Sequence, residues 1–187
     1  MKNICVYCGS SSGKSEVYMK GAGELGELLA EHDIGLVYGG ASVGIMGGVA
    51  DAVLAAGGNV TGVIPQAISD MEVAHTGLSK LEVVADMHQR KSRMMELSDG
   101  FIAMPGGLGT LEEIFEALTW LQLGFHSKPC ALFNIDNYYS KLLGFLQHAS
   151  EEGFVKKTHT DMLLLGDTAN AVLEQLLSAN IKYETKL

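Results

Sequence analysis

Short apolar runs alternate with helical patterns along the whole chain. Seven runs of four to six residues are apolar on both faces and bounded by Gly, Pro, Asp or Asn, which is typical of strands covered on both sides. They span residues 4–8, 35–38, 59–64, 81–84, 100–104, 130–134 and 162–165. Between them, apolar stripes predict helices over about 15–31, 44–56, 86–98, 111–121, 137–152 and 168–178. We therefore expect an α/β fold with an open parallel sheet of about seven strands and helices on both faces.

Length and charge narrow the class of protein. The 187 residues suit one domain spanning 1–187, and 13 Lys and Arg against 22 Asp and Glu give a net charge of −9. This acidity argues against nucleic acid or a membrane as a partner. The first apolar run is too short for a signal peptide, and glycines, Asp51 and Asn59 interrupt the most apolar region. Three cysteines without framework spacing suit a reducing compartment, so we expect a soluble cytoplasmic protein.

Three glycine- or serine-rich turns follow predicted strands and lead into predicted helices. They are residues 9–13, 39–48 and 105–110. In open α/β sheets ligands bind at the carboxyl ends of the strands, where free backbone N–H groups and helix dipoles favour phosphate. The alternative is that these glycines only form turns. Residues 9–15 are one residue too short for a P-loop, and no turn fits G-x-G-x-x-G, so a kinase or a dehydrogenase is weakly supported.

The predicted helix after Asp86 places cations on an apolar stripe. Asp86 is a plausible N-cap, and Met87 opens a stripe of buried methionines. Arg90 and Lys91 lie three and four residues after Met87, on the same side. A cation against a core needs an anion, so we expect Arg90 to face a ligand. The alternative is that both side chains extend past the methionines to water.

The turn at 105–110 runs into a cluster of glutamates. Thr110 and Glu113 have the spacing of a capping box, with Thr110 as N-cap, which is a purely structural explanation for both. Glu112, Glu113 and Glu116 nevertheless crowd the start of a helix that follows a candidate phosphate loop. A carboxylate there could face a bound sugar.

Other reactive residues offer weaker signals. Cys5 and Cys8 lie three apart in a strand and point to opposite faces, which argues against a redox pair. The six histidines lack ligand spacing, so we predict no metal and no other cofactor. The long polar stretch 65–80 is expected to be an irregular loop near the site.

Residues 105–113 read P-G-G-x-G-T-x-x-E, and four further motifs lie at residues 86–91, 8–11, 39–47 and 120–124. Together these motifs resemble the LONELY GUY (LOG) family of cytokinin riboside 5′-monophosphate phosphoribohydrolases. The similarity runs from about residue 2 to residue 180. It implies a Rossmann-like homodimer that cleaves an adenine-type nucleoside 5′-monophosphate into free base and ribose 5-phosphate. Members have been labelled lysine decarboxylases, but no pyridoxal phosphate site is recognisable in this sequence.

The resemblance also implies site residues. Arg90 and Glu113 would be the catalytic pair. The substrate-binding residues would be Gly9, Ser10, Gly39, Gly40, Gly44, Met46, Gly47, Glu72, Met87, Lys91, Pro105, Gly106, Gly107, Gly109, Thr110, Glu112 and Thr119. A carboxylate such as Glu113 could stabilise positive charge on the ribose and orient water, while Arg90 could hold phosphate or assist departure of the base.

Three other functions stay open at this point. The protein could be a general AMP nucleosidase without preference for cytokinin nucleotides. It could be a sensor that binds a nucleotide without cleaving it, or an enzyme that uses a flavin or nicotinamide.

Overall fold

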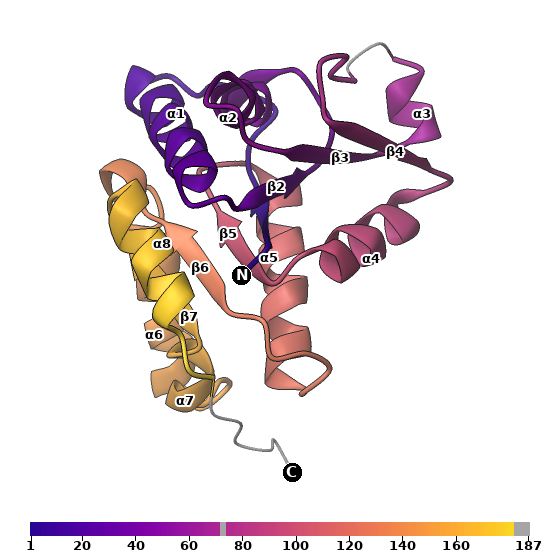
Figure 1. The fold of residues 1–187 in the computed structure, drawn as a ribbon. Coiled ribbons are helices and arrows are strands. Elements are labelled where there is room, and N and C mark those ends of the chain that lie inside the picture. Colours follow the sequence, from indigo (N-terminus) through magenta and orange to yellow (C-terminus); the bar gives the residue numbers. More distant parts are fainter. Residues whose placement is uncertain (72–73, 182–187) are drawn as a thin grey trace.

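Seven strands and eight α-helices form an α/β domain in the computed structural model, which describes residues 1–71 and 74–181 (Figure 1). The strands are β1 (Asn3–Tyr7), β2 (Gly35–Tyr38), β3 (Val60–Pro65), β4 (Lys80–Val84), β5 (Gly100–Ala103), β6 (Cys130–Phe133) and β7 (Leu163–Gly166). The helices are α1 (Glu16–Glu31), α2 (Gly44–Ala55), α3 (Gln66–Ser69), α4 (Met87–Leu97), α5 (Leu108–Gln122), α6 (Ser140–Glu151), α7 (Lys157–Thr160) and α8 (Ala169–Ser178), with a 3-10 turn at Ile135–Asn137.

All strand pairings in the sheet are parallel, and the order is β4-β3-β2-β1-β5-β6-β7. The chain first builds outward from β1 to β4 and then returns to the other side of β1 with β5. The strand order therefore reverses between β1 and β5, which is where open α/β sheets form their ligand crevice. The seven predicted strands and the predicted parallel sheet are confirmed.

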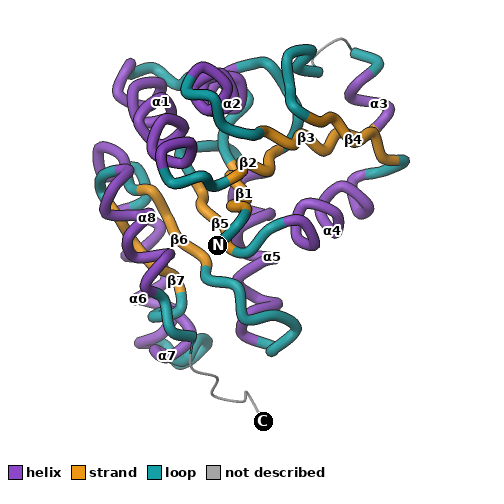
Figure 2. Tube along the Cα trace, in the orientation of Figure 1, coloured by secondary structure: helices purple, strands orange, loops and turns teal. Residues whose placement is uncertain are grey.

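Alternating residues of the central strands enter two separate cores. Ile4 and Val6 pack with α1, α2 and α8, whereas Cys5 and Tyr7 pack with α4 and α5 on the other face. Figure 2 shows this layering, with α1 and α2 on one side of the strands and α4 and α5 on the other. Cys8 belongs to the first core and Cys5 to the second, so the two thiols lie on opposite faces as expected.

The structure differs from the sequence-based expectations in three elements. The stretch 65–80, expected to be irregular, contains the short helix α3, and a second short helix, α7, was not predicted. Strand β4 was expected to be covered on both faces, but it lies at the sheet edge and leaves Val83 47% exposed. Across residues 1–71 and 74–181, no helix has both the length and the apolar character needed to cross a membrane.

Candidate functional site

The three glycine turns meet at the carboxyl edge of the sheet. The Gly9 N–H after β1 donates to the Pro105 carbonyl after β5 at 3.1 Å. The Met46 N–H, in the first turn of α2, donates to the Gly9 carbonyl at 3.2 Å. The turns after β1, β2 and β5 are thus joined directly by backbone hydrogen bonds.

Close backbone approach explains two of these glycines. A Cβ on Gly44 (φ +58°) would lie 2.5 Å from the Ser10 carbonyl oxygen, and a Cβ on Gly106 would lie 2.9 Å from the Gly9 nitrogen. Side chains at either position would separate the turns. Gly47 is also required by packing, because its Cβ would overlap the backbone of Ser42.

Helix α5 begins at Leu108, earlier than the capping-box spacing predicts. Its N-cap is Gly107, which has no side chain to accept the first N–H groups of the helix. Thr110 lies within the first turn, so its assignment as N-cap and the capping box with Glu113 are wrong. The buried Thr110 side chain instead packs against Gly106. The start of α5 therefore presents N–H groups and a positive dipole end to the glycine turns.

Gly107 and Gly109 are surrounded by open space. A Cβ at either residue would meet no atom within 4 Å, and neither has a positive φ. Protein packing therefore does not require glycine at these two positions. The space beside the first turn of α5 is open to a ligand.

A cavity of about 340 Å³ lies between the turns after β1 and β5. Its lining includes Gly9, Ser10, Ser11, Gly13, Tyr18, Ile45, Pro105, Gly106, Gly107 and Tyr138. The sequence reasoning missed the two tyrosines. The Tyr138 hydroxyl donates to the Gly106 carbonyl at 2.6 Å, and its ring meets Tyr18 edge-on. Tyr138 follows β6, so the rule that sites form at the carboxyl ends of strands could have identified it.

Arg90 of α4 and Glu113 of α5 form an ion pair beside these turns. Arg90 Nη1 donates to Glu113 Oε1 at 2.7 Å, and the side chains are only 11% and 9% exposed. Arg90 Nε also donates to the Val63 carbonyl at 3.3 Å. Asp86 supports this arrangement as the N-cap of α4, as predicted, because its side chain accepts the Gln89 N–H at 2.8 Å.

The surroundings of Glu113 shift its proton affinity. Burial raises the pKa of the Glu113 carboxyl, while the adjacent Arg90 guanidinium acts in the opposite direction. A carboxyl whose pKa is raised in this way is suited to accept and release a proton. Burial also raises the pKa of the Cys5 and Cys8 thiols, so neither is an activated nucleophile.

Lys91 lies next to Arg90 but has different partners. Its ammonium bonds to Glu112, and to Glu116 at 3.1 Å, and the side chain is 14% exposed. The hydrogen bond to Glu112 is the main cause of the raised pKa of Lys91. The alternative that both side chains extend past the methionines to water is therefore wrong, since Arg90 and Lys91 are only 11% and 14% exposed. That Arg90 faces a ligand stays a prediction.

The structure shows different surroundings for the other predicted site residues that it describes. A Cβ on Gly39 would overlap Arg90 and come within 2.5 Å of Met46 Cε, so the turn after β2 contacts the ion pair. Met87 was predicted to be buried, but as the first residue of α4 it is 43% exposed. The Thr119 hydroxyl donates to the Phe115 carbonyl of its own helix at 2.6 Å. Glu72 lies outside the described residues.

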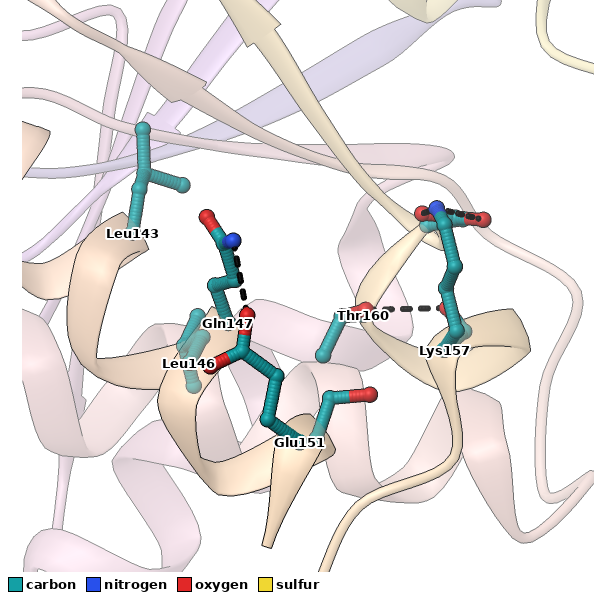
Figure 3. A pocket seen from close by; sticks show the side chains of 8 residues that line it. Leu143, Leu146, Gln147, Glu151, Lys157 and Thr160 are labelled. Carbon is teal, nitrogen blue, oxygen red and sulfur yellow. Dashed lines mark hydrogen bonds and ion pairs between the residues drawn. The ribbon is translucent and has the colours of Figure 1, made fainter. Parts of the chain in front are cut away.

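A second cavity lies away from the glycine turns. It measures about 500 Å³ and is formed by α6 and α7, whose polar side chains pair within each helix (Figure 3). Gln147 donates to Glu151, and Lys157 pairs with Asp161. The residues that line it include none of those predicted for the site. In the described part of the chain, His, Cys, Asp and Glu side chains form no group of three or more that could hold a metal ion.

Comparison with known proteins identifies the family. A family model described as "Possible lysine decarboxylase" matches residues 46–176. Cytokinin riboside 5′-monophosphate phosphoribohydrolase of Rhodococcoides fascians is 47% identical over 173 residues, covering 91% of this chain and 87% of that protein. The Arabidopsis thaliana enzyme of the same name, LOG3, is 46% identical over 175 residues, covering 94% of this chain and 81% of that protein.

Solved structures share the fold at lower sequence identity. The molybdenum cofactor binding protein of Rippkaea orientalis superposes with a TM-score of 0.72 at 24% identity, covering 95% of this chain and 97% of that one. The molybdenum cofactor carrier protein of Chlamydomonas reinhardtii gives 0.72 at 21% identity, covering 95% and 99%. Both likenesses concern the Rossmann-type fold alone. The family model and the relatives, at nearly half identical residues over most of their length, show that this chain belongs to the LOG family.

Proposed function

We propose that this protein hydrolyses the N-glycosidic bond of cytokinin riboside 5′-monophosphates, and of AMP, to free base and ribose 5-phosphate. The named relatives support this reaction. The observation that carries it is the buried Arg90–Glu113 pair beside an open glycine turn at a helix start. A protein with a net charge of −9 can bind a nucleotide here because backbone N–H groups supply the anion site.

The 5′-phosphate binds at the first turn of α5. The open positions Gly107 and Gly109 let it approach the N–H groups that the helix leaves unbonded. Binding the phosphate remote from the reacting bond supplies energy that can be used at the ribose. We therefore expect unphosphorylated ribosides to be poor substrates.

Glu113 acts at the anomeric carbon. A water oxygen attacks C1′, the bond from C1′ to the base nitrogen breaks, and its electron pair leaves with the base. Positive charge builds on the ribose in the transition state, and the Glu113 carboxylate stabilises it. Glu113 takes the proton of the attacking water, which its raised pKa favours. The departing base takes up a proton from solvent, and Glu113 then releases its proton to solvent.

Arg90 orients the Glu113 carboxylate. Its Nη1 is bonded to Glu113 and its Nε to Val63, which leaves Nη2 towards Gly39. This arrangement supports an orienting role over bidentate capture of phosphate, since the latter needs two free nitrogens of one guanidinium edge.

Several of the other predicted substrate-binding residues lie in the same region. Gly9, Ser10, Pro105 and Gly106 line the 340 Å³ cavity. Lys91 and Glu112 form the neighbouring charged cluster. The raised pKa of Lys91 keeps its ammonium protonated, whereas a Schiff base requires a neutral amine, so its chemistry does not favour a decarboxylase.

The test is release of free base, measured by chromatography. Purified protein is incubated with AMP, isopentenyladenosine 5′-monophosphate and the two ribosides. We expect release from the monophosphates, and the ratio of the two values of kcat/KM distinguishes a cytokinin enzyme from a general AMP nucleosidase. Absence of release with binding retained would support the sensor and refute the hydrolase.

Adjacent glutamates provide the matched control. Glu113→Gln should lower kcat about 10³-fold, the range for losing an acid–base and electrostatic group. Glu112→Gln changes the same type of side chain on the same turn, but Glu112 is 54% exposed and pairs with Lys91. We expect its effect to fall mainly on KM. Equal losses of kcat in the two variants would contradict the assignment of Glu113.

The assembly and compartment belong to the same proposal. A homodimer is supported by large apolar side chains exposed at the end of α5, where Leu123 is 46% and Phe125 is 72% exposed. Light scattering of the purified protein tests it. Three free, buried cysteines suit the reducing cytoplasm, which fractionation of cells tests.

A further inference from the structure

His75 connects the segment before β4 to helix α2. Its Nε2 lies 2.9 Å from Asp51 Oδ1, and the Gly77 N–H donates to its Nδ1 at 3.0 Å. Because Nδ1 accepts, the ring proton is on Nε2, which donates to Asp51. The His75 side chain is only 11% exposed, although Asp51 is 71% exposed. We call this pair the His75–Asp51 brace.

The brace holds the backbone of residue 75 against the second glycine turn. The His75 N–H donates to the Gly40 carbonyl at 2.9 Å, and Ala41 and Ala74 form an antiparallel bridge. Gly40 has φ +79°, a conformation that glycine adopts readily and that needs outside contacts to be held in one state. The brace supplies such contacts from α2 and from the segment before β4.

The neighbouring residue of that turn contacts the ion pair. Gly39 has no side chain, and the space is filled by the Arg90 guanidinium, whose Nη2 is the nearest atom to a Cβ built there. A shift of the turn would therefore move Arg90 with it. Arg90 in turn bonds to Glu113 at 2.7 Å.

We propose that His75 and Asp51 are positioning residues that set the placement of Arg90 through the Gly39–Gly40 turn. The proposal rests on the proposed hydrolase function for its catalytic consequence. Neither residue contacts the reacting groups. A hydrogen bond to a carboxylate as exposed as that of Asp51 contributes little to stability, whereas a misplacement of about 1 Å in a catalytic group costs up to about 100-fold in rate.

The kinetic test compares a variant of Asp51 that cannot accept the His75 hydrogen bond with one that still can. Asp51→Ala should lower kcat roughly 10- to 100-fold with KM changed less than about two-fold, because Arg90 acts on the transition state. Asp51→Asn should recover most of kcat, since the amide oxygen accepts the same N–H. Asp161→Ala, which removes an exposed carboxylate paired with Lys157 on α7, is the control and should leave kcat unchanged.

A double-mutant cycle shows whether the effect passes through Arg90. In an Arg90→Lys background, Asp51→Ala should cost little further activity, because the group that it positions is already displaced. A full, additive loss there would overturn the proposal. So would unchanged kcat in Asp51→Ala, or equal losses in Asp51→Ala and Asp51→Asn.

Nuclear magnetic resonance separates the brace from the proposed function. In Asp51→Ala, and not in Asp51→Asn, the His75 and Gly77 amides should exchange faster and the Arg90 Nε–H resonance should shift. These readouts do not depend on turnover. If the wild-type protein released no base, the proposed hydrolase function would be refuted. If Asp51→Ala left the amide exchange of His75 and Gly77 and the Arg90 Nε–H resonance unchanged, the brace would be refuted.

Discussion

Gly106 and Gly109 should respond in opposite directions to the same added methyl group. A Cβ at Gly106 would overlap the Thr110 hydroxyl and lie 2.9 Å from the Gly9 nitrogen, so the two turns must separate. Overpacking of this kind costs about 1–3 kcal/mol of the free energy of unfolding. At Gly109, within α5, a Cβ meets nothing within 4 Å, and alanine is a better helix former by about 0.5–1 kcal/mol.

The two substitutions therefore separate an effect on stability from an effect on substrate binding. Gly109→Ala should raise the melting temperature, at roughly 2–4 °C per kcal/mol for a chain of this length, while Gly106→Ala lowers it. A Cβ tilts towards the helix N-terminus, so the new methyl at Gly109 enters the space proposed for the phosphate. We expect KM for AMP to rise about ten-fold, equivalent to about 1.4 kcal/mol of binding.

Gly144→Ala is the control, because Gly144 is also helical and open but lies on α6. It should raise the melting temperature by a similar amount and leave KM unchanged. Thermal unfolding followed by circular dichroism and steady-state base release give both quantities. A loss of stability in Gly109→Ala, or a KM equal to that of Gly144→Ala, would refute the reasoning about the open space.

Three further predictions concern α4 and its neighbours. Arg90→Ala leaves Glu113 buried without its cation and should cost about 3–5 kcal/mol in urea unfolding, against a smaller cost for Arg90→Lys. Asp86→Ala should lower stability by about 1 kcal/mol through loss of the N-cap, whereas Asp86→Asn should be near neutral by the same measurement. Hydrogen bonds from Arg93 lower the pKa of Glu82 to about 2 from 4.5, so its stabilisation is present above pH 4.5 and is lost as pH falls towards 2. Because Arg93 is 38% exposed, we expect Glu82→Gln to cost only about 1 kcal/mol at pH 7 and nothing near pH 2, as unfolding against pH would show.

The sequence predicts the sheet well because its strands are short, apolar and punctuated by turn residues. The edge position of β4 is harder to predict, because its apolar residues resemble those of the buried strands. Val83 is exposed because the strand order places β4 at the edge of the sheet. The predicted capping box is wrong because a Thr and a Glu three residues apart can lie at a helix start or within its first turns. Glycine at position 107 ends the turn earlier, and the helix then places Thr110 inside its first turn.

The site is predictable only in part. Arg90 and Glu113 are each marked by a local anomaly, a cation on an apolar stripe and a carboxylate behind a glycine turn. Their pairing depends on α4 and α5 packing on one face of the sheet. The brace joins residues 24 positions apart, and neither Asp51 nor His75 has a local pattern that distinguishes it from a surface residue. Such long-range hydrogen bonds need the fold before they can be seen.

The charge balance of the ion-pair cluster has a consequence for how substrate arrives. Arg90 and Lys91 face three carboxylates, Glu113, Glu112 and Glu116, within a protein whose net charge is −9. A nucleotide phosphate brings roughly 1.5 to 2 further negative charges, so enzyme and substrate repel each other at long range. Dissolved ions shorten the reach of that repulsion to about 10 Å at 0.1 M. Productive collisions should therefore become more frequent as moderate salt is added, the reverse of the behaviour of enzymes that draw in anions with a positive surface.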